Sequence, residues 1–408
     1  MTKKTSNTSS KDTSSNTPRA KTPRRGPLIT IVSVVVFVVM AGVYVLTSAD
    51  PLDLFGPTAE APSTPPPISA SPTVEEKTGW WQVYFTDPTT INDPENLTGS
   101  VAEELIALID DAKKTIDIAS FEFNYVPVAE ALIAASKRGV EVRWVTDDEY
   151  GIEEDIDDDL RLFPRLRRAG ASVRDDKRRA LMHNKFWIFD GKIVWTGSTN
   201  ITVNGFFRNN NNALAIESKE LAAIYQREFD EMWDGEFGPK STSTVDDQSI
   251  IIEGTPVQVL FAPEDEAVDH LIPLLKNAKS SIRFMAFSFT HNTLGDALMG
   301  RSRAGVDVKG IFGRRGSETD FSELRVFHCA LIPVRQDTNK GTFHHKVIVI
   351  DEEIVITGSL NFSDNANESN DENVIIIASR ELAALYLQEF ERHWATAQEP
   401  SKDDIDCQ

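Results

Sequence analysis

The chain has 408 residues, of which 40% are hydrophobic and 26% are charged, and its formal net charge is −21. This length suffices for two domains, or for one large domain built by duplication. The charge is uneven, since residues 1–25 carry +6 and the rest of the chain carries −27. An acidic body repels polyanions at long range, which disfavours a general nucleic-acid binder.

Cysteine usage excludes two further classes. Only Cys329 and Cys407 are present, too few for a disulfide framework or a cysteine-based metal cage. A single bridge between them is possible, but nothing in the sequence requires it. We expect both cysteines to be structurally incidental.

Three segments precede the expected folded body. Residues 1–27 are rich in Ser, Thr, Lys and Arg and have no apolar period, so we expect them to be disordered. Residues 28–47 form an uncharged, mostly apolar run that is long enough to cross a bilayer as a helix. The basic residues before this run predict a cytoplasmic N-terminus and an extracytoplasmic body. Residues 48–78 hold seven prolines and predict a semi-rigid linker.

The apolar run has a second interpretation, which is a signal peptide cleaved after Ala49. The run is longer than the apolar core of a typical signal peptide. We therefore expect an uncleaved anchor and a single-pass membrane protein.

Hydrophobic patterns predict an α/β structure in each half of the body. The expected elements of the first half are strand 116–121, helix 129–138, strands 140–146, 186–189 and 193–196, and helix 221–233. Gly139 marks the end of the first helix, and Asp190-Gly191 predicts a tight hairpin. The expected elements of the second half include strands 347–350 and 354–357 and helix 382–394.

Three stretches of the first half recur in the same order in the second half. The matched ranges are 112–145 with 278–311, 183–200 with 344–361, and 209–233 with 370–394. The offset is 166 residues for the first pair and 161 for the other two, so one length change accounts for the difference. Chance does not produce three collinear matches. We expect two halves, at 79–240 and 241–398, and a tail at 399–408.

Both halves carry one pattern of polar residues around a histidine. His183 and His344 are each followed by Lys at +2, Asp at +7, Gly-Ser at +14 and +15, and Asn at +17. The candidate residues are His183, Lys185, Asp190, Ser198 and Asn200, with their counterparts His344, Lys346, Asp351, Ser359 and Asn361. His and Lys two positions apart on a strand share one face. Each half therefore presents an imidazole, an ammonium, a hydroxyl and an amide on one surface.

These residue types predict phosphoryl-transfer chemistry. Two Lys and two Asn side chains would bind a phosphoryl group. One imidazole would attack phosphorus to give a phosphohistidine, while the other protonates the leaving oxygen and then activates water. No cluster of Cys, Asp and Glu has metal-ligand spacing. We therefore expect no metal and no cofactor, with Lys and Asn supplying the charge stabilisation that Mg²⁺ gives elsewhere.

The doubled pattern resembles the HKD motif of the phospholipase D superfamily, and the resemblance covers about residues 79–398. It implies two α/β/α halves about a pseudo-twofold axis, with both motifs forming one site at their junction. One chain would then suffice, and we expect a monomer. The resemblance also implies supporting, structural roles for Asp190 and Asp351.

One position breaks the symmetry of the two motifs. Many members of this superfamily carry a Glu, after the Gly-Ser-x-Asn segment, that hydrogen-bonds the catalytic histidine. Glu372 stands 28 residues after His344, whereas Asn211 stands 28 residues after His183. A nearby carboxylate favours a protonated imidazole, as a general acid needs, and an amide does not. The resulting hypothesis makes His183 the nucleophile and His344 the acid and base.

The other histidines lack partners in the repeat. We expect His270, His291, His328 and His393 to be packing or surface residues, and His345 to face away from His344. The basic stretch 161–179, together with Arg314 and Arg315, is either solvated charge or a rim that attracts an anionic substrate.

The substrate class depends on the segments outside the motifs. A membrane anchor and an acidic body favour phospholipid hydrolysis with release of phosphatidate. The compact halves also fit a metal-independent endonuclease that cleaves DNA or RNA. A phosphatidyl transferase like cardiolipin synthase and an inactive phosphate- or lipid-binding module are further alternatives.

Overall fold

A computed structural model describes residues 79–157, 160–400, 405 and 407. The expected disordered segment 1–27, the membrane helix 28–47 and the linker 48–78 lie outside these residues, as does most of the tail. Within the described ranges, no helix combines the length and the apolar character that crossing a membrane requires.

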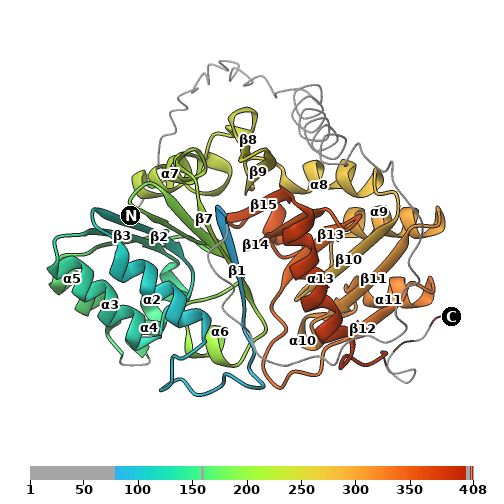
Figure 1. The fold of residues 1–408 in the computed structure, drawn as a ribbon, viewed down its shortest axis with the longest axis horizontal. Coiled ribbons are helices and arrows are strands. Elements are labelled where there is room, and N and C mark those ends of the chain that lie inside the picture. The colour runs from blue at the N-terminus through green and yellow to red at the C-terminus, as the bar shows by residue number, and fades with distance from the viewer. Residues whose placement is uncertain (1–78, 158–159, 401–404, 406, 408) are drawn as a thin grey trace, which may run out of the picture.

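The first half contains one seven-stranded sheet (Figure 1). Its strands are β1 (Trp81–Phe85), β2 (Thr115–Ser120), β3 (Glu141–Thr146), β4 (Ser172–Asp175), β5 (Lys185–Phe189), β6 (Ile193–Gly197) and β7 (Asn212–Glu217). Their order in the sheet is β1-β7-β6-β5-β2-β3-β4. Strands β2, β3 and β4 are parallel, and the other neighbours pair antiparallel.

The second half contains an eight-stranded sheet. Its strands are β8 (Ser249–Ile252), β9 (Thr255–Ala262), β10 (Ser281–Ala286), β11 (Asp307–Phe312), β12 (Val334–Gln336), β13 (Lys346–Ile350), β14 (Ile354–Gly358) and β15 (Glu372–Ala378). Their order is β12-β11-β10-β13-β14-β15-β9-β8. From β9 to β12 this order repeats that of the first sheet strand for strand. The duplication read from the sequence is therefore also a duplication of topology.

Helices cover both faces of each sheet. The longer ones are α2 (Val101–Asp111), α3 (Val126–Lys137), α5 (Leu162–Ala169), α7 (Lys219–Asp234), α8 (Ala267–Lys276), α9 (Asn292–Arg303), α11 (Glu323–Cys329) and α13 (Arg380–Trp394). The short ones are η1 (Asp148–Glu153), α4 (Glu154–Asp157), α6 (Val203–Phe207), η2 (Gly238–Lys240), η3 (Val245–Asp247), α10 (Arg314–Ser317) and α12 (Asp364–Glu368).

Three apolar clusters define the layers. One joins α2, α3 and α5 to the outer face of the first sheet, and another joins α8, α9 and α11 to the outer face of the second. The third lies between the sheets and contains α7 and α13 (Figure 1). Strand β5 is buried on both faces, because Phe186 and Ile188 enter the central cluster while Trp187 and Phe189 enter an outer one. Each half is therefore an α/β/α sandwich, as expected.

The predicted hairpins and closing helices are confirmed, with small shifts at their boundaries. The first hairpin turns through Asp190 and Gly191, with φ of 52° and 61°. The second turns through Asp351 and Glu352, with φ of 54° and 58°. Positive φ at both central residues matches the right-handed twist of the strands that the turn joins.

The expectation that both cysteines are incidental is wrong. Cys329 and Cys407 form a disulfide across 78 residues of sequence. The bond joins the C-terminal tail to the end of α11, and Ile405 packs against the same apolar cluster as that helix. The pairing depends on how the tail folds back, which the spacing of the cysteines does not reveal.

Reciprocal hydrogen bonds join the two halves. Thr196 Oγ1 donates to Asn373 Oδ1 at 2.6 Å. In the mirrored contact, Asn212 Nδ2 donates to Thr357 Oγ1 at 2.9 Å. These four residues occupy two equivalent repeat positions. Such reciprocity is typical of a twofold arrangement, and it supports the pseudo-twofold axis expected from the sequence.

Candidate active site

Both motif histidines lie at the junction of the halves. The backbone N–H of His183 donates to the carbonyl of Asp371 at 3.0 Å, and that of His344 donates to the carbonyl of Asn210 at 2.8 Å. These bonds cross from one half to the other. They bring the residues that follow each acceptor, Glu372 and Asn211, beside the histidine of the opposite half.

Glu372 contacts His183. Both carboxyl oxygens of Glu372 lie 2.8 Å from Nδ1 of His183, and the hydroxyl of Ser359 donates to Oε2 at 2.6 Å. Burial raises the pKa of Glu372 to about 8, although Lys185 opposes the shift. Burial, followed by the charges of the two motif lysines, lowers the pKa of His183 well below its usual value. The raised pKa of Glu372 and the lowered pKa of His183 leave the shared proton on the carboxyl group, which donates it to Nδ1, so the hydrogen of the neutral imidazole lies on Nε2.

Asn211 contacts His344. Nδ1 of His344 lies 2.9 Å from Oδ1 of Asn211 and 3.0 Å from the carbonyl of Ser198. The amide orientation is set by its neighbours, because the Ser198 hydroxyl donates to Oδ1 and Asn211 Nδ2 donates to the Gly205 carbonyl. Two acceptors at Nδ1 fix the hydrogen there. Nε2 of His344 is therefore left with a free lone pair.

The roles predicted for the two histidines depended on the opposite pairing, which is wrong. Glu372 was expected beside His344, in its own half, and it lies beside His183. The two spacings along the sequence are equal, but the residues just before β7 and β15, Asn210 and Asp371, hydrogen-bond to the histidine of the opposite half. The carboxylate that favours a protonated imidazole therefore lies beside His183 and not beside His344.

Each motif lysine lies beside the histidine of its own motif. Lys185 Nζ donates to the carbonyl of His183 at 2.7 Å, and Lys346 Nζ donates to that of His344 at 2.9 Å. Each ammonium also lies over a phenyl ring, that of Phe121 or Phe287. Burial lowers the pKa of Lys185 to about 8. Burial and then the charge of Lys185 lower the pKa of Lys346 well below its usual value. Two neighbouring ammonium groups can bind the negatively charged oxygens of a phosphodiester.

The motif asparagines differ from each other. Asn200 Nδ2 donates to Oε2 of Glu122 at 2.8 Å. The side chain of Asn361 makes no hydrogen bond with another described residue and is available to a ligand. Sequence reasoning missed Glu122, although the repeat contains the signal, since Ser288 occupies the matching position.

The motif aspartates have the structural role that the resemblance implies. The carboxylate of Asp190 accepts the backbone N–H groups of Lys113, Lys114 and Thr115. Asp351 does the same for residues 279–281. Burial alone would raise the pKa of Asp190, but the three donors lower it. Each aspartate thereby ties its hairpin to the start of the neighbouring strand.

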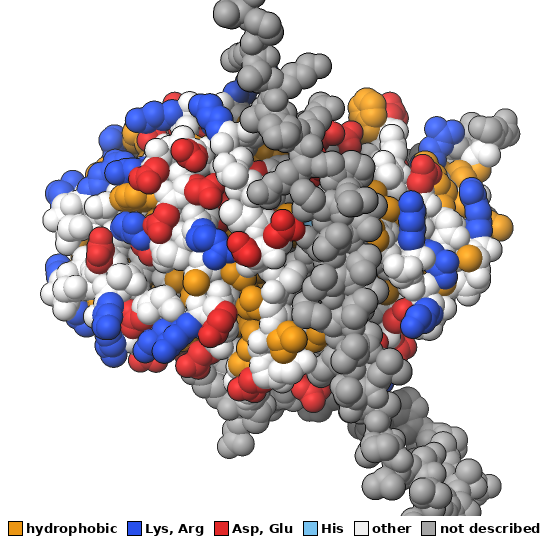
Figure 2. All heavy atoms as spheres, turned by 90° about the horizontal axis from the view of Figure 1, so that it is seen from above, with side chains coloured by type: hydrophobic (Ala, Val, Ile, Leu, Met, Phe, Trp, Pro, Cys, Tyr) orange, Lys and Arg blue, Asp and Glu red, His pale blue; other side chains and the backbone are white. Residues whose placement is uncertain are grey.

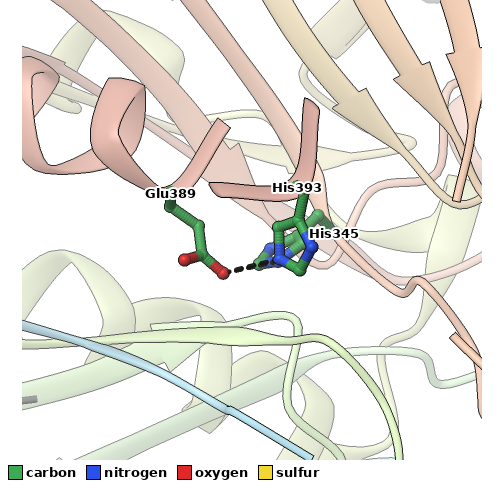
Figure 3. A group of neighbouring side chains, drawn as sticks. All are labelled: His345, Glu389 and His393. Carbon is green, nitrogen blue, oxygen red and sulfur yellow. Dashed lines mark hydrogen bonds and ion pairs between the residues drawn. The ribbon is translucent and has the colours of Figure 1, made fainter. Parts of the chain in front are cut away.

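His345 faces away from His344, as predicted, and contacts α13. Figure 3 shows it beside Glu389 and His393, three side chains whose ligand atoms are close enough to hold a metal ion. His393 Nε2 lies 2.8 Å from Oε1 of Glu389. Arg392 donates to both carboxylate oxygens of Glu389, at 2.6 and 2.8 Å. The guanidinium thus supplies the positive charge that a metal would bring, and we interpret the group as a buried ion-pair network.

A second group with ligand-type atoms is Asp147, Asp148 and Asp176. The carboxylate of Asp147 accepts backbone N–H groups, including that of Met182, and Arg178 pairs with Asp176. These contacts explain the group without an ion. Of the remaining histidines, His270 and His291 are buried and His328 is half-buried, in line with packing or surface roles.

The basic residues near the two motifs differ in their surroundings. Arg314 and Arg315 line a cavity of about 270 Å³ with Lys340 and Phe287, the residue that contacts His344. In the basic stretch 161–179, by contrast, Arg178 is engaged in ion pairs with Asp176 and Asp371.

Comparison with known proteins gives a match in both halves. The model of the family described as "Cardiolipin synthase, PLD-like domain" matches residues 105–233 and 271–394. "Mitochondrial cardiolipin hydrolase" of Xenopus tropicalis is 34% identical over 144 residues, which are 35% of this chain and 66% of that protein. "Phospholipase D" of Rickettsia prowazekii is 36% identical over 132 residues, which are 32% of this chain and 64% of that protein. The chain thus spans slightly under two thirds of the length of these relatives.

A solved structure supports the arrangement of both halves together. Phosphatidylserine synthase of Haemophilus influenzae superposes with a TM-score of 0.58 at 16% identity, over 78% of this chain and 87% of that one. At this identity the likeness concerns the fold alone. The family match covers more than half of the chain and includes both motifs, and the chain therefore belongs to the phospholipase D superfamily.

Proposed function

We propose that this protein hydrolyses a phosphodiester bond of phospholipids through a phosphohistidine and releases phosphatidate. The observation that carries the proposal is the composite site. Two histidines, each held at Nδ1 by the other half, face two buried lysines. Each half alone lacks the residue that orients its own histidine, so the site is complete only when both are folded together in one chain.

The hydrogen-bond partners assign the roles of the histidines. His344 is the nucleophile, because its hydrogen is fixed at Nδ1 and the lone pair of Nε2 is free to attack phosphorus. His183 is the general acid, because its Nε2 carries a hydrogen and Glu372 can replace that proton from the other side of the ring. This assignment reverses the one drawn from sequence spacing.

The reaction then runs in two steps. Nε2 of His344 forms a bond to phosphorus, the bond to the headgroup oxygen breaks, and that oxygen takes the proton from His183. In the second step, His183 accepts a proton from water, the resulting hydroxide attacks phosphorus, and the bond to His344 breaks. Lys185, Lys346 and the free amide of Asn361 bind the non-bridging oxygens as negative charge develops.

Three observations favour phospholipid as the substrate. Two relatives carry the names phospholipase D and cardiolipin hydrolase. The body of the protein is acidic, and Figure 2 shows basic and acidic side chains interspersed on the face seen from above, where the described atoms are visible. Such a face lacks the broad positive field that polynucleotide binding uses.

We also propose that the body works outside the cytoplasm. The expected anchor with its preceding basic cluster supports this location, and so does the disulfide between Cys329 and Cys407, since such bonds persist in oxidising compartments.

The test uses the full chain in detergent. Phospholipid vesicles, single-stranded DNA and RNA are each supplied in the presence of EDTA. Release of phosphatidate, together with radiolabel trapped on His344, supports the proposal. Cleavage of the polynucleotide alone would establish the endonuclease instead. Transfer to an added alcohol without hydrolysis would indicate a phosphatidyl transferase, and no turnover at all would indicate a binding module. Loss of activity with EDTA would contradict the metal-free mechanism.

A further inference from the structure

The active site is electrically asymmetric between the halves. Glu122 lies just beyond β2, at the position that Ser288 occupies beyond β10. The chain after β3 continues as Asp147-Asp148-Glu149, whereas the chain after β11 continues as Gly313-Arg314-Arg315. The strand ends that border the site are thus acidic in the first half and basic in the second.

Glu122 connects the catalytic groups to a cavity. Its Oε2 accepts the amide N–H of Asn200 at 2.8 Å. Burial raises its pKa, and the charges of Lys185 and Lys346 oppose the shift, so both ammonium groups lie within electrostatic reach. The same side chain lines a cavity of about 160 Å³. A group bound in this cavity would therefore be adjacent to the phosphoryl site.

The cavity lining is acidic and polar. It consists of Glu122, Phe123, Asn124, Glu154, Asp155, Thr202 and Asn204. The described residues of this lining include neither Lys nor Arg. On the opposite side of the site, the lining of the larger cavity includes three basic residues, Arg314, Arg315 and Lys340, beside the two acids Glu318 and Asp337.

The proposed mechanism predicts on which side of the site the headgroup leaves. If His344 of the second half attacks phosphorus in line, the leaving group departs toward His183 in the first half. The leaving group of phosphatidate release is the headgroup alcohol. It would therefore move to the side where Glu122 and the acidic cavity lie, while the phosphatidyl group stays on the basic side with His344.

We infer that Glu122 and the cavity that it lines bind the ammonium group of an amine-bearing phospholipid headgroup, such as ethanolamine. This inference rests on the proposed function. The carboxylate accepts a charge-assisted hydrogen bond from the ammonium, and it repels the second phosphate of a polyanionic substrate. Glu122 thus determines the headgroup specificity. The second half has Ser288 at the matching position and offers no such carboxylate.

The test compares two headgroups on three proteins. The full chain, Glu122→Gln and Glu122→Ser are assayed on phosphatidylethanolamine and phosphatidylglycerol in mixed micelles. The wild type is expected to prefer the ethanolamine lipid, and Glu122→Gln should lower the ratio of the two kcat/KM values about 10-fold, as expected for one charge-assisted hydrogen bond. Glu122→Ser should lower the ratio at least as much.

Glu318→Gln is the matched control. It removes the same charge from the basic side, where Glu318 pairs with Arg314, and should leave the ratio unchanged. Turnover of bis(p-nitrophenyl) phosphate, which has no ammonium group, should fall less in Glu122→Gln than turnover of the ethanolamine lipid. An unchanged lipid ratio, or an equal loss on all three substrates, would overturn the inference.

Binding measurements distinguish a failure of this inference from a failure of the proposed function. In His344→Ala, calorimetry with glycerophosphoethanolamine and glycerophosphoglycerol measures the preference without turnover. Absence of a preference that depends on Glu122 contradicts the inference even if the wild type is an active phospholipase. Failure of the wild type to release phosphatidate from any lipid contradicts the proposed function, whatever the binding result.

Discussion

The two halves of this molecule share a sheet order and a motif, but they differ in what surrounds the motif. The first half supplies Asn211, which orients His344, and the second supplies Glu372, which orients His183. The lysines and the structural aspartates make equivalent contacts in both halves. The motif lysines and aspartates are thus alike in the two halves, while the residues that contact the histidines differ.

The same contrast extends behind the site, to helices α7 and α13. In the second half, Glu389 is buried with a cation, because Arg392 donates to it. In the first half, Glu228 occupies the matching position and interacts with Glu264, another carboxyl group. Burial and the neighbouring acids raise the pKa of Glu228, and they raise that of Glu264 to about 7. Arg392 thus neutralises the charge of the buried Glu389 in the second half. In the first half, protonation neutralises the buried Glu228.

Replacing each histidine singly should have the largest effects on kcat. The two variants should differ in whether they still form phosphoenzyme. His344→Ala should abolish phosphoenzyme formation and lower kcat by at least about 10⁴-fold, since the nucleophile is lost. His183→Ala should lower lipid hydrolysis by about 10²- to 10⁴-fold. With a p-nitrophenyl ester, whose leaving group needs no acid, His183→Ala should still form phosphoenzyme. Rapid-quench trapping measures both, and label on His183 would reverse the roles.

The orienting residues should differ in the kind of defect that they cause. Glu372→Gln should lower kcat about 100-fold on lipid and much less on a p-nitrophenyl ester, because it removes the proton supply to His183. Asn211→Ala should lower the turnover of both substrates alike. It removes an acceptor that holds the hydrogen of the nucleophile His344 at Nδ1. Steady-state kinetics on the two substrates distinguish these outcomes. Equal patterns for the two variants would mean that the histidines share both tasks.

The pH dependence of kcat/KM should test the protonated groups around His183. Lys185 and Glu372 both have a pKa of about 8 in the free enzyme. As the pH rises through this value, Lys185 loses its positive charge and the pair of Glu372 and His183 loses its proton. We therefore expect kcat/KM to fall about 10-fold per pH unit or more above pH 8. A profile that is flat to pH 10 would contradict this expectation.

The smallest predicted effects concern stability and test the contrast between the buried carboxylates. The raised pKa of Glu264 means that its protonated form is favoured in the folded state. This contribution is full below the unfolded value near 4.5 and is lost as the pH rises toward 7. Glu228→Gln should therefore raise Tm at pH 8 by a few degrees, and Glu389→Gln should lower it. Calorimetry at pH 5 and pH 8 checks the signs, with Glu318→Gln as a neutral control.

Local patterns in the sequence determined much of this protein. The alternation of apolar residues and the turn residues at 190–191 and 351–352 determine two hairpins, because these signals act within a few residues. The repeated spacing of His, Lys, Asp and Asn, which have one chemistry in both halves, identified the site residues. The resemblance to the phospholipase D superfamily also implied a single site built from both halves.

The tertiary structure alone decided which partner each histidine has. Glu372 and His183 are 189 residues apart, and Asn211 and His344 are 133 apart. No spacing rule reaches across such distances, and the equal offset within each half pointed to the wrong pairs. The same limit hid the disulfide and the place of Glu122 beside the lysines. The sequence thus determined which residue types gather at the site, and the backbone hydrogen bonds that join the two halves decided which partner contacts each histidine.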